Sequence, residues 1–358
     1  MTDTQNNCAQ LLTDILAPND LLRLMKIIRD SHRVVITAHH GPDGDAVGSC
    51  LAWQDYLQRM GKDVHVVLPN DFPDFLKWMP MNKGIVLYNE STQQALQYIE
   101  RADLICCLDF NDFSRLQQMG DAVRKSKARR LMIDHHENPT QEGFDLVISH
   151  PEMSATAEIV FRLLWQMGAY DSMSRSAAAN IYTGMMCDTG AFTYNSNDPA
   201  IYIIISLLMR KKIDKDEINK KVYRSWSQHK FEMWNDILNH HTEILPQFHA
   251  AYYTLTRQQM KDYRFIRGDA EGLVNEPLKI RGMRLSVALR EDTEEDVIRV
   301  SLRSANGFHC REMAERFFNG GGHDDAAGGK LPFPMQSAVA TLNEALEAFK
   351  EELTGKAE

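Results

Sequence analysis

The sequence lacks the features that would place the chain in a membrane. No uninterrupted apolar stretch in its 358 residues approaches the roughly 18 that a membrane-spanning helix needs. Residues 1–10 are polar and lack the charged and then apolar layout of a signal peptide. These absences argue against an integral membrane protein, and we expect a cytoplasmic protein with no membrane partner.

Cysteine pairs with the spacing of a metal site are also missing. The six cysteines form no CxxC pair, and several lie within apolar stretches such as LICCLDF (104–110). Neighbouring Cys106 and Cys107 would point to opposite faces of a strand, which argues against a shared metal ion or a disulfide. Buried, reduced thiols are therefore the prediction.

The chain has no excess of positive charge. Lys and Arg number 40 against 49 Asp and Glu, which gives a formal charge of −9. This balance works against long-range attraction of a polyanion, so we expect no binding of long duplex nucleic acid. It leaves open a small phosphate ester held by metal ions and a few local cations.

Repeats and low-complexity tracts are absent, and short β-rich runs alternate with helical patterns instead. This alternation predicts an α/β fold whose N-terminal domain, residues 1–213, has a mainly parallel sheet with helices on both faces. A helical pattern from about Pro199 to Leu245 predicts a helical connector at 214–247, followed by a smaller C-terminal α/β domain with a mixed sheet at 248–358. Strands are expected at 34–37, 64–69, 85–88, 104–109, 130–134, 146–149, 250–256, 284–290 and 297–303.

Acidic and histidine residues gather near the ends of the predicted elements. Ligands of open α/β sheets bind at the carboxyl ends of the strands, and four segments carry candidate metal ligands: 39–45, Asp109, 134–136 and Asp188. Taken singly, an Asp after a strand is commonly a helix cap or turn residue, and a lone His is more often structural. Together, four carboxylates at one edge would repel one another unless cations neutralised them. A pair of divalent metal ions is therefore the prediction.

Six motifs follow one another along the chain. They are HHGPDGDAVGS (39–49), LD (108–109), DHH (134–136), CDTG (187–190), VSLRS (300–304) and GGGHDDAAGG (320–329). The series resembles the DHH phosphoesterase superfamily together with its associated substrate-binding domain, over nearly the whole chain. One such motif is weak evidence, whereas six in the same order are specific.

The resemblance implies a phosphoesterase in which two metal ions activate a water nucleophile. Mixed imidazole and carboxylate ligands suit Mn²⁺, with Mg²⁺ or Co²⁺ also possible. The implied ligands are His39, Asp43 and Asp109 for one ion, and Asp45, Asp109, His135 and Asp188 for the other. Asp109 would bridge the two ions and His136 would contact the scissile phosphate, so these two are the implied catalytic residues.

In the C-terminal domain the resemblance implies a substrate-recognition set: Arg303, Ser304, Gly321, Gly322 and His323. Guanidinium and hydroxyl groups suit phosphate oxygens, and glycine lets backbone N–H groups approach a phosphate closely. Without the resemblance, Arg303 would be taken as a surface charge. The glycine run after the helix at 310–318 would be taken as a helix C-cap extended into a flexible turn.

The resemblance is strongest to the branch that hydrolyses very short RNA and the 3′-phosphate of adenosine bisphosphate (pAp). We therefore expect Mn²⁺-dependent hydrolysis of di- to pentanucleotides and of pAp to mononucleotides, and the family suggests a homodimer. The alternative is a phosphodiesterase acting on c-di-AMP or on its linear product pApA, which the motifs do not separate from the first reading. An inorganic pyrophosphatase and a catalytically silent nucleotide-binding protein are further alternatives. His40-Gly41 replaces an apolar residue and Asn of the family pattern, which would alter the active-site loop.

Overall fold

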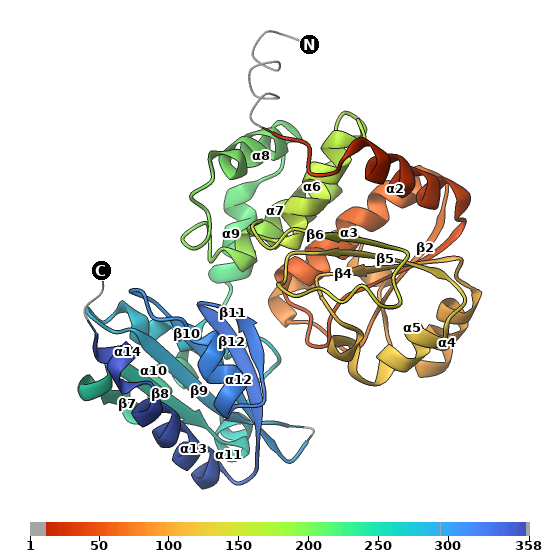
Figure 1. Cartoon of the computed structure of the whole chain (residues 1–358). Coiled ribbons are helices and arrows are strands. Elements are labelled where there is room, and N and C mark those ends of the chain that lie inside the picture. The colour runs from red at the N-terminus through yellow and green to blue at the C-terminus, as the bar shows by residue number, and fades with distance from the viewer. Residues whose placement is uncertain (1–11, 294, 356–358) are drawn as a thin grey trace. The chain divides into compact units, whose positions relative to one another are not determined.

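The computed structural model describes residues 12–293 and 295–355, and the chain divides into two compact units, Met1–Ser225 and Trp226–Glu358 (Figure 1). The division falls within the segment 214–247 that was expected to connect the domains. The prediction of helix as far as Leu245 is wrong, because Thr242–Leu245 form strand β7. Ile244 and Leu245 continue the apolar pattern of helix α10 (Gln228–His240), so the pattern does not mark the change to a strand.

The first unit contains a six-stranded parallel sheet with the order β3-β2-β1-β4-β5-β6. This confirms the expected mainly parallel sheet. All five residues of the central strand β4 are buried, as a strand covered on both faces requires. The strands are β1 (Arg33–Thr37), β2 (Asp63–Leu68), β3 (Val86–Leu87), β4 (Leu104–Leu108), β5 (Arg129–Asp134) and β6 (Leu146–Ser149).

Helices cover both faces of this sheet, as predicted. Figure 1 shows α4 and α5 on one side and α3, α6 and α7 on the other. Cys106 packs in the core under α3, α6 and α7, and Cys107 packs in the core under α4 and α5, so the two thiols do lie on opposite faces. The helices are α2 (Pro18–Asp30), α3 (Gly44–Arg59), α4 (Thr92–Arg101), α5 (Gly120–Lys125), α6 (Thr156–Gln166), α7 (Arg175–Asp188), α8 (Pro199–Arg210) and α9 (Lys215–Tyr223).

The strand order reverses direction at β1. From this strand the chain proceeds to β2 and β3 on one side, and β4, β5 and β6 then follow on the other. The carboxyl ends of β1 and β4 therefore flank the topological switch point, where open α/β sheets bind their ligands. His39 follows β1 and Asp109 follows β4, so the switch point carries two of the predicted metal ligands.

Helices α3, α6 and α7 pack closely at two glycines. A Cβ atom on Gly48 of α3 would lie 2.5 Å from the Asn180 carbonyl oxygen of α7. A Cβ atom on Gly184 of α7 would lie 2.7 Å from the Ala157 Cβ of α6 and 3.0 Å from Asp45 Oδ1 of α3. The absence of these side chains therefore brings the three helices together around Asp45.

The second unit contains a mixed sheet with the order β11-β12-β10-β9-β8-β7, in which β8 and β9 are parallel and the other pairs antiparallel. Alternating residues of β8 enter different cores: Tyr252 packs with α12, α13 and α14, and Tyr253 packs with α10 and α11. The strands are β7 (Thr242–Leu245), β8 (Ala250–Leu255), β9 (Leu285–Glu291), β10 (Val297–Ser304), β11 (Gly321–His323) and β12 (Ala326–Pro332). The helices are α10 (Gln228–His240), α11 (Arg257–Asp262), α12 (Arg311–Phe317), α13 (Met335–Ala348) and α14 (Lys350–Thr354).

The glycine run after α12 is a strand, and not the flexible turn that it would suggest without the family resemblance. Gly321–His323 form β11 and pair with β12. Gly322 has a φ of +145°, and a Cβ atom there would lie 2.5 Å from the Ala326 carbonyl oxygen. A Cβ atom on Gly320 would lie 1.8 Å from the Gly328 carbonyl oxygen. The glycines thus allow the backbone to approach β12 more closely than residues with side chains could.

Two further expectations concern the described part of the chain. Within residues 12–293 and 295–355, no helix is long and apolar enough to cross a membrane. Of the cysteines in that part, Cys50, Cys106, Cys107 and Cys310 are buried and free, and Cys187 is half-buried. Cys8 and the polar residues 1–10 lie outside the described residues.

Candidate metal centre

The predicted metal ligands meet at the carboxyl edge of the parallel sheet. His39 follows β1, Asp109 follows β4, and His135 follows β5 directly. The remaining three come from helices: Asp43 caps α3, Asp45 lies in its first turn, and Asp188 is the last residue of α7. Below, site 1 means His39, Asp43 and Asp109, and site 2 means Asp45, Asp109, His135 and Asp188.

Site 1 presents one imidazole nitrogen to two carboxylates. His39 Nε2 lies 3.5 Å from Asp109 Oδ2 and 4.0 Å from Asp43 Oδ2. The other ring nitrogen, Nδ1, lies 3.0 Å from the His40 carbonyl oxygen, to which it can donate only if it carries the proton. Such a bond selects the tautomer that turns Nε2 toward the carboxylates as a potential metal ligand.

Asp43 is both a helix cap and a member of site 1. Its Oδ1 accepts hydrogen bonds from the Asp45 and Ala46 N–H groups, at 3.0 and 3.1 Å, and so caps α3. Its Oδ2 is the oxygen nearer to His39. The structural and functional explanations for this Asp therefore hold together, each using a different oxygen.

Site 2 is organised around His135 Nε2. This atom lies 3.6 Å from Asp188 Oδ2, 3.7 Å from Asp109 Oδ1 and 4.0 Å from Asp45 Oδ2. Its Nδ1 lies 3.2 Å from the Met153 carbonyl oxygen, which again selects the tautomer that turns Nε2 toward the carboxylates. Asp45 and His135 are almost completely buried, at 1% and 3% exposed.

Asp109 contacts both sites with different oxygens. Its Oδ2 faces His39 and its Oδ1 faces His135, as expected of a residue that bridges two metal ions. Its φ of +64° is in the left-handed region, and its N–H donates to the Ile133 carbonyl oxygen at 3.0 Å. Burial disfavours its charge, but the contact with His39 and the charges of the three histidines outweigh burial and hold the pKa of Asp109 below its ordinary value.

Without a cation, the other carboxylates of site 2 resist ionisation. Burial and the charges of Asp109 and Asp188 raise the pKa of Asp45 well above its ordinary value. Burial also raises the pKa of Asp188 to about 6, which the charge of His135 only partly offsets. Burial lowers the pKa of His135, but the surrounding carboxylates outweigh it and raise that pKa to about 9. Protons thus occupy a buried donor set of imidazoles and carboxylates, and such a set fits divalent cations.

His136 is oriented by a residue whose role the sequence did not reveal. Its Nδ1 lies 2.8 Å from Asp134 Oδ1, and Asp134 is completely buried. The second oxygen, Asp134 Oδ2, has no hydrogen-bond partner among the described residues. The sequence places Asp134 next to His135 and His136, but only the structure shows that its side chain turns back to His136.

The predicted recognition residues of the second unit do not all share a face. Arg303 of β10 pairs with Ala326 of β12, which in turn pairs with His323 of β11. Paired residues of antiparallel strands point to the same face, so Arg303 and His323 flank the small Ala326. Ser304 points to the opposite face, where its buried hydroxyl oxygen accepts from the Cys310 N–H at 3.2 Å.

Family models match both halves of the chain. The model described as the DHH family, N-terminal domain, matches residues 33–185, and the model described as the DHHA1 domain matches residues 250–355. A crystal structure of an exopolyphosphatase-related protein from Bacteroides fragilis is 44% identical, with a TM-score of 0.89 over 95% of this chain and 99% of that one. The chain belongs to the DHH family. This DHH protein is accordingly a phosphoesterase, as the order of its motifs predicted.

Two curated relatives of this DHH protein carry the same name, bifunctional oligoribonuclease and PAP phosphatase NrnA. The one from Thermus thermophilus is 27% identical over 323 residues, which cover 90% of each chain. The one from Bacillus subtilis is 24% identical over 309 residues, which cover 86% of this chain and 92% of the relative. The similarity therefore extends through both units.

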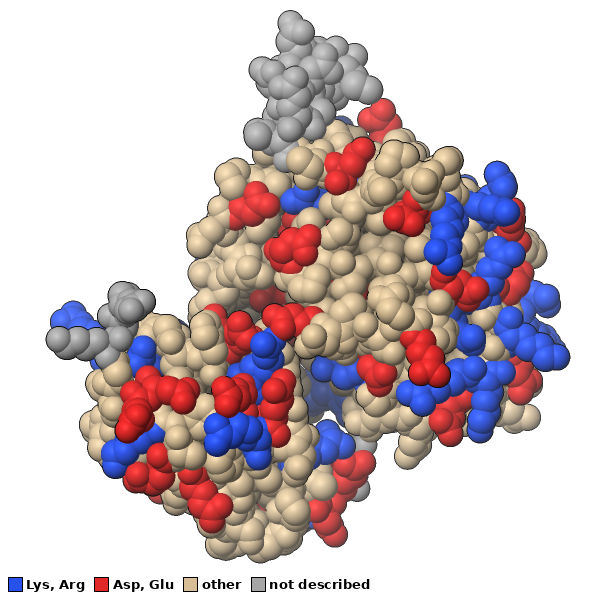
Figure 2. Space-filling view, viewed as in Figure 1, with Lys and Arg blue, Asp and Glu red and all other residues tan. Residues whose placement is uncertain are grey.

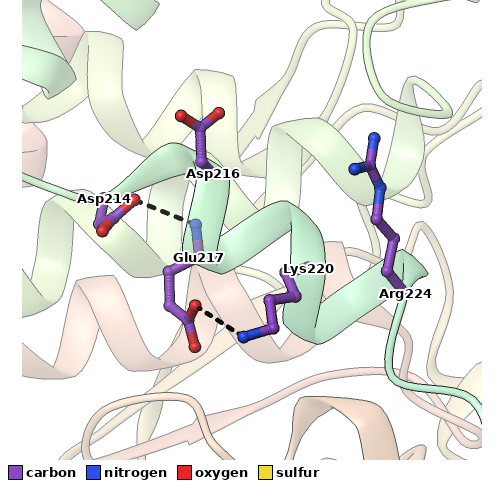
Figure 3. Close-up of a pocket in the computed structure, with 5 residues that line it drawn as sticks. All are labelled: Asp214, Asp216, Glu217, Lys220 and Arg224. Carbon is purple, nitrogen blue, oxygen red and sulfur yellow. Dashed lines mark hydrogen bonds and ion pairs between the residues drawn. The ribbon is translucent and has the colours of Figure 1, made fainter.

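A hollow elsewhere on this DHH protein is lined by charged residues whose contacts stabilise a helix (Figure 3). It lies along α9 and is lined by Asp214, Asp216, Glu217, Lys220 and Arg224. Asp214 caps the helix by accepting from the Glu217 N–H at 3.0 Å, and Glu217 pairs with Lys220 at 3.5 Å. These contacts stabilise the helix itself, and the lining includes none of the predicted site residues.

Basic residues of the DHH protein do not form a continuous stripe on the face that Figure 2 shows. Across the described residues visible there, Lys and Arg are interspersed with Asp and Glu on both units. A track for a long polyanion would require an extended basic surface. Neither unit taken by itself shows such an extended basic surface among the described residues of this view.

Proposed function

We propose that this DHH phosphoesterase binds two Mn²⁺ ions and hydrolyses di- to pentaribonucleotides and pAp to mononucleotides. The observation that carries the proposal is the position of Asp109, whose two oxygens face two different histidines. One carboxylate shared by two imidazole-containing donor sets is the arrangement that a pair of metal ions needs. The names of the curated relatives support the choice of substrates.

The donor set would hold one ion at site 1 and one at site 2, with Asp109 common to both. Two divalent cations at such positions supply Lewis-acid charge that lowers the pKa of water and neutralises the phosphate. The chain orients the ligands: Asp43 Oδ2 and Asp109 Oδ2 face His39. His135 is faced by the other oxygen of Asp109, Oδ1, and by two further carboxylates, those of Asp45 and Asp188. Burial of Asp45, Asp109 and His135 keeps bulk water from screening these charges.

His136 is the proposed contact to the scissile phosphate. Its Nδ1 is held by Asp134 at 2.8 Å, which fixes the ring so that a phosphate oxygen would be met through Nε2. A protonated imidazole in this position would stabilise the negative charge that develops on the phosphate oxygens. His136→Ala should therefore lower the turnover number while cation binding persists.

Recognition of the substrate's terminal phosphate is proposed for the second unit. Arg303 and His323 present a guanidinium and an imidazole on either side of Ala326, where no long side chain intervenes. Such a pair of donors suits phosphate oxygens. Ser304 points to the other face of the sheet, where its hydroxyl oxygen accepts from the Cys310 N–H and helps to hold β10 in place.

The test is Mn²⁺-dependent turnover of pApA, pAp and c-di-AMP side by side, with Asp109→Ala as the inactive control. Fast turnover of pApA and pAp, with c-di-AMP slow, is the expected result. Efficient opening of c-di-AMP would instead assign the protein to cyclic dinucleotides, which no observation on this chain favours. Absence of turnover of all three with metal bound would overturn the proposal.

A further inference from the structure

Helix α6 begins at the metal centre without a cap of its own. Its N-cap residue is Ala155, which has no side-chain acceptor for the first N–H groups of the helix. Ser, Thr, Asp or Asn ordinarily fills this position, because the first turn of a helix leaves its N–H groups without partners. Because this region is completely buried, the N–H groups need acceptors from another part of the protein.

Asp45 of α3 provides the missing acceptors. Its Oδ2 accepts from the Thr156 N–H at 2.6 Å, and its Oδ1 accepts from the Ala157 N–H at 2.8 Å. Oδ1 also accepts from the Ser49 hydroxyl at 3.2 Å. Among the described residues, Oδ2 accepts only the hydrogen bond from Thr156, and of the two Asp45 oxygens it is the one that lies 4.0 Å from His135 Nε2. Oδ2 is therefore the Asp45 atom placed to bind a cation. Asp45 therefore caps a helix from another element and belongs to site 2 at the same time.

Thr156 reaches a second ligand with its side chain. Its hydroxyl donates to Asp109 Oδ1 at 2.9 Å, while its N–H donates to Asp45. One residue thus holds two carboxylates, one from the start of α3 and one from the end of β4. A hydroxyl and an N–H on one rigid helix turn fix their separation.

A buried ion pair holds the first turn of α6 in place. Glu158 Oε2 accepts from the N–H and the hydroxyl of Ser154, at 3.0 and 2.7 Å. Glu158 Oε1 accepts from Arg162 Nε at 2.8 Å and lies 2.7 Å from a terminal nitrogen of the same guanidinium. All three residues are less than 5% exposed. Thr156 therefore lies on a helix turn that Glu158 holds in place through its contacts with Ser154 and Arg162.

We propose that Thr156 is a positioning residue that sets the separation of Asp45 and Asp109 before a cation binds. The proposal rests on the metal-binding part of the proposed function and on no particular substrate. The role proposed for Thr156 is to orient two ligands through its hydroxyl and its N–H, and not to bind a cation itself. Its effect is on affinity: residues that orient metal ligands typically change metal affinity by roughly 10- to 100-fold when they are replaced.

The experiment compares three variants of the full-length, metal-free protein by Mn²⁺ titration, with free Mn²⁺ followed by electron paramagnetic resonance. Thr156→Val keeps the shape and the N–H but removes the hydroxyl. Thr156→Ser keeps the hydroxyl. Thr183→Val makes the same change at another completely buried threonine, whose hydroxyl donates within its own helix to the Ala179 carbonyl oxygen at 2.7 Å.

The expected result is a Kd for Mn²⁺ that rises about 10- to 100-fold in Thr156→Val, returns to within about threefold of wild type in Thr156→Ser, and is unchanged in Thr183→Val. Thermal unfolding of each metal-free variant shows that it is folded. A folded Thr156→Val protein with wild-type affinity would overturn the proposal, as would equally weak binding by the Ser variant.

The outcomes separate this proposal from the proposed function. If wild type binds no divalent cation, both fall. If wild type binds Mn²⁺ and Thr156→Val binds it with the same affinity, the positioning role falls and the proposed function stands. If the affinities follow the expected order but wild type hydrolyses neither short RNA nor pAp, the proposed function falls and the positioning role stands.

Discussion

Protons and cations compete for His135. The three carboxylates that face this imidazole raise its pKa to about 9, so the metal-free protein carries a proton there at neutral pH. A metal ligand must be deprotonated, and binding therefore releases this proton. The Mn²⁺ affinity should rise by about tenfold per pH unit between pH 7 and 8.5 if one proton is displaced. Calorimetric titration in two buffers of different protonation enthalpy measures the release, and an affinity independent of pH would contradict the assignment.

Asp188 gives the metal-free protein a second pH dependence of the opposite kind. Its pKa in the folded state is raised from 3.8 to about 6, so the folded protein binds more protons than the unfolded chain between these values. Stability contributed by this group is therefore lost as the pH rises from about 4 to about 6. Metal-free Asp188→Asn, which cannot ionise, should be more stable than wild type above pH 6, and the difference should shrink as the pH falls to 4.

Chemical denaturation in a chelator across this pH range measures the effect. Asp121→Asn, at a side chain that is 80% exposed, is the matched control and should change the free energy of unfolding little at any pH. A difference between wild type and Asp188→Asn that stays constant with pH would contradict the prediction.

The residue types of the metal centre are readable from the sequence, whereas the residues that orient them are not. Asp, His and the order of the motifs predict the ligands, because few other side chains bind divalent cations. Thr156 and Asp134 are different. A Thr at the start of a helix and an Asp at the end of a strand have many possible partners. Only the approach of α3 to α6, permitted by Gly184, shows that Thr156 meets two ligands.

At the scale of single elements, the two glycines of β11 differ in how closely other atoms pack against them. A Cβ atom on Gly321 would have only the Glu315 side chain nearby, at 4.0 Å, whereas one on Gly322 would lie 2.5 Å from the Ala326 carbonyl oxygen. Gly322→Ala should therefore destabilise the protein by about 1–3 kcal/mol. Gly321→Ala should leave the free energy of unfolding within about 0.5 kcal/mol of wild type.

Kinetics on the two glycine variants then test substrate recognition. If the Gly321 backbone approaches a phosphate, Gly321→Ala should raise KM for pApA several-fold without a change in melting temperature. A wild-type KM for the folded Gly321→Ala protein would contradict a role of the Gly321 backbone in binding phosphate.

The local pattern of apolar residues predicted most helices and strands. It failed for strands that form only because they pair with another strand. The buried strand β4 was predicted because a fully apolar run is a strong local signal. Strand β7 was missed because it is short, lies at the edge of its sheet and forms only through pairing with β8. The opposite directions of Arg303 and Ser304 follow from the alternation of any strand, once the strand is known.

Over the whole molecule, cation binding should have a local signature. All candidate ligands belong to the first unit, where α3, α6 and α7 surround Asp45. Mn²⁺ at 100 times its Kd would stabilise that unit by about 2.7 kcal/mol. Hydrogen exchange should therefore slow at the start of α6, notably at the Thr156 and Ala157 N–H groups. Exchange in β9 and β10 should not change, and equal protection of both sheets would contradict this expectation.

The distribution of residues along the chain also bears on how such proteins diversify. Every candidate metal ligand lies between His39 and Asp188, whereas Arg303 and His323, which we propose for recognition, belong to the other unit. Mutations that retarget the enzyme can accumulate in the second unit while the hydrolytic apparatus stays under separate selection. Asp45 is less free to change, because the same carboxylate caps the start of α6 and faces His135. A lineage that abandoned hydrolysis would still be expected to keep an acceptor at this position, as a relic required for folding.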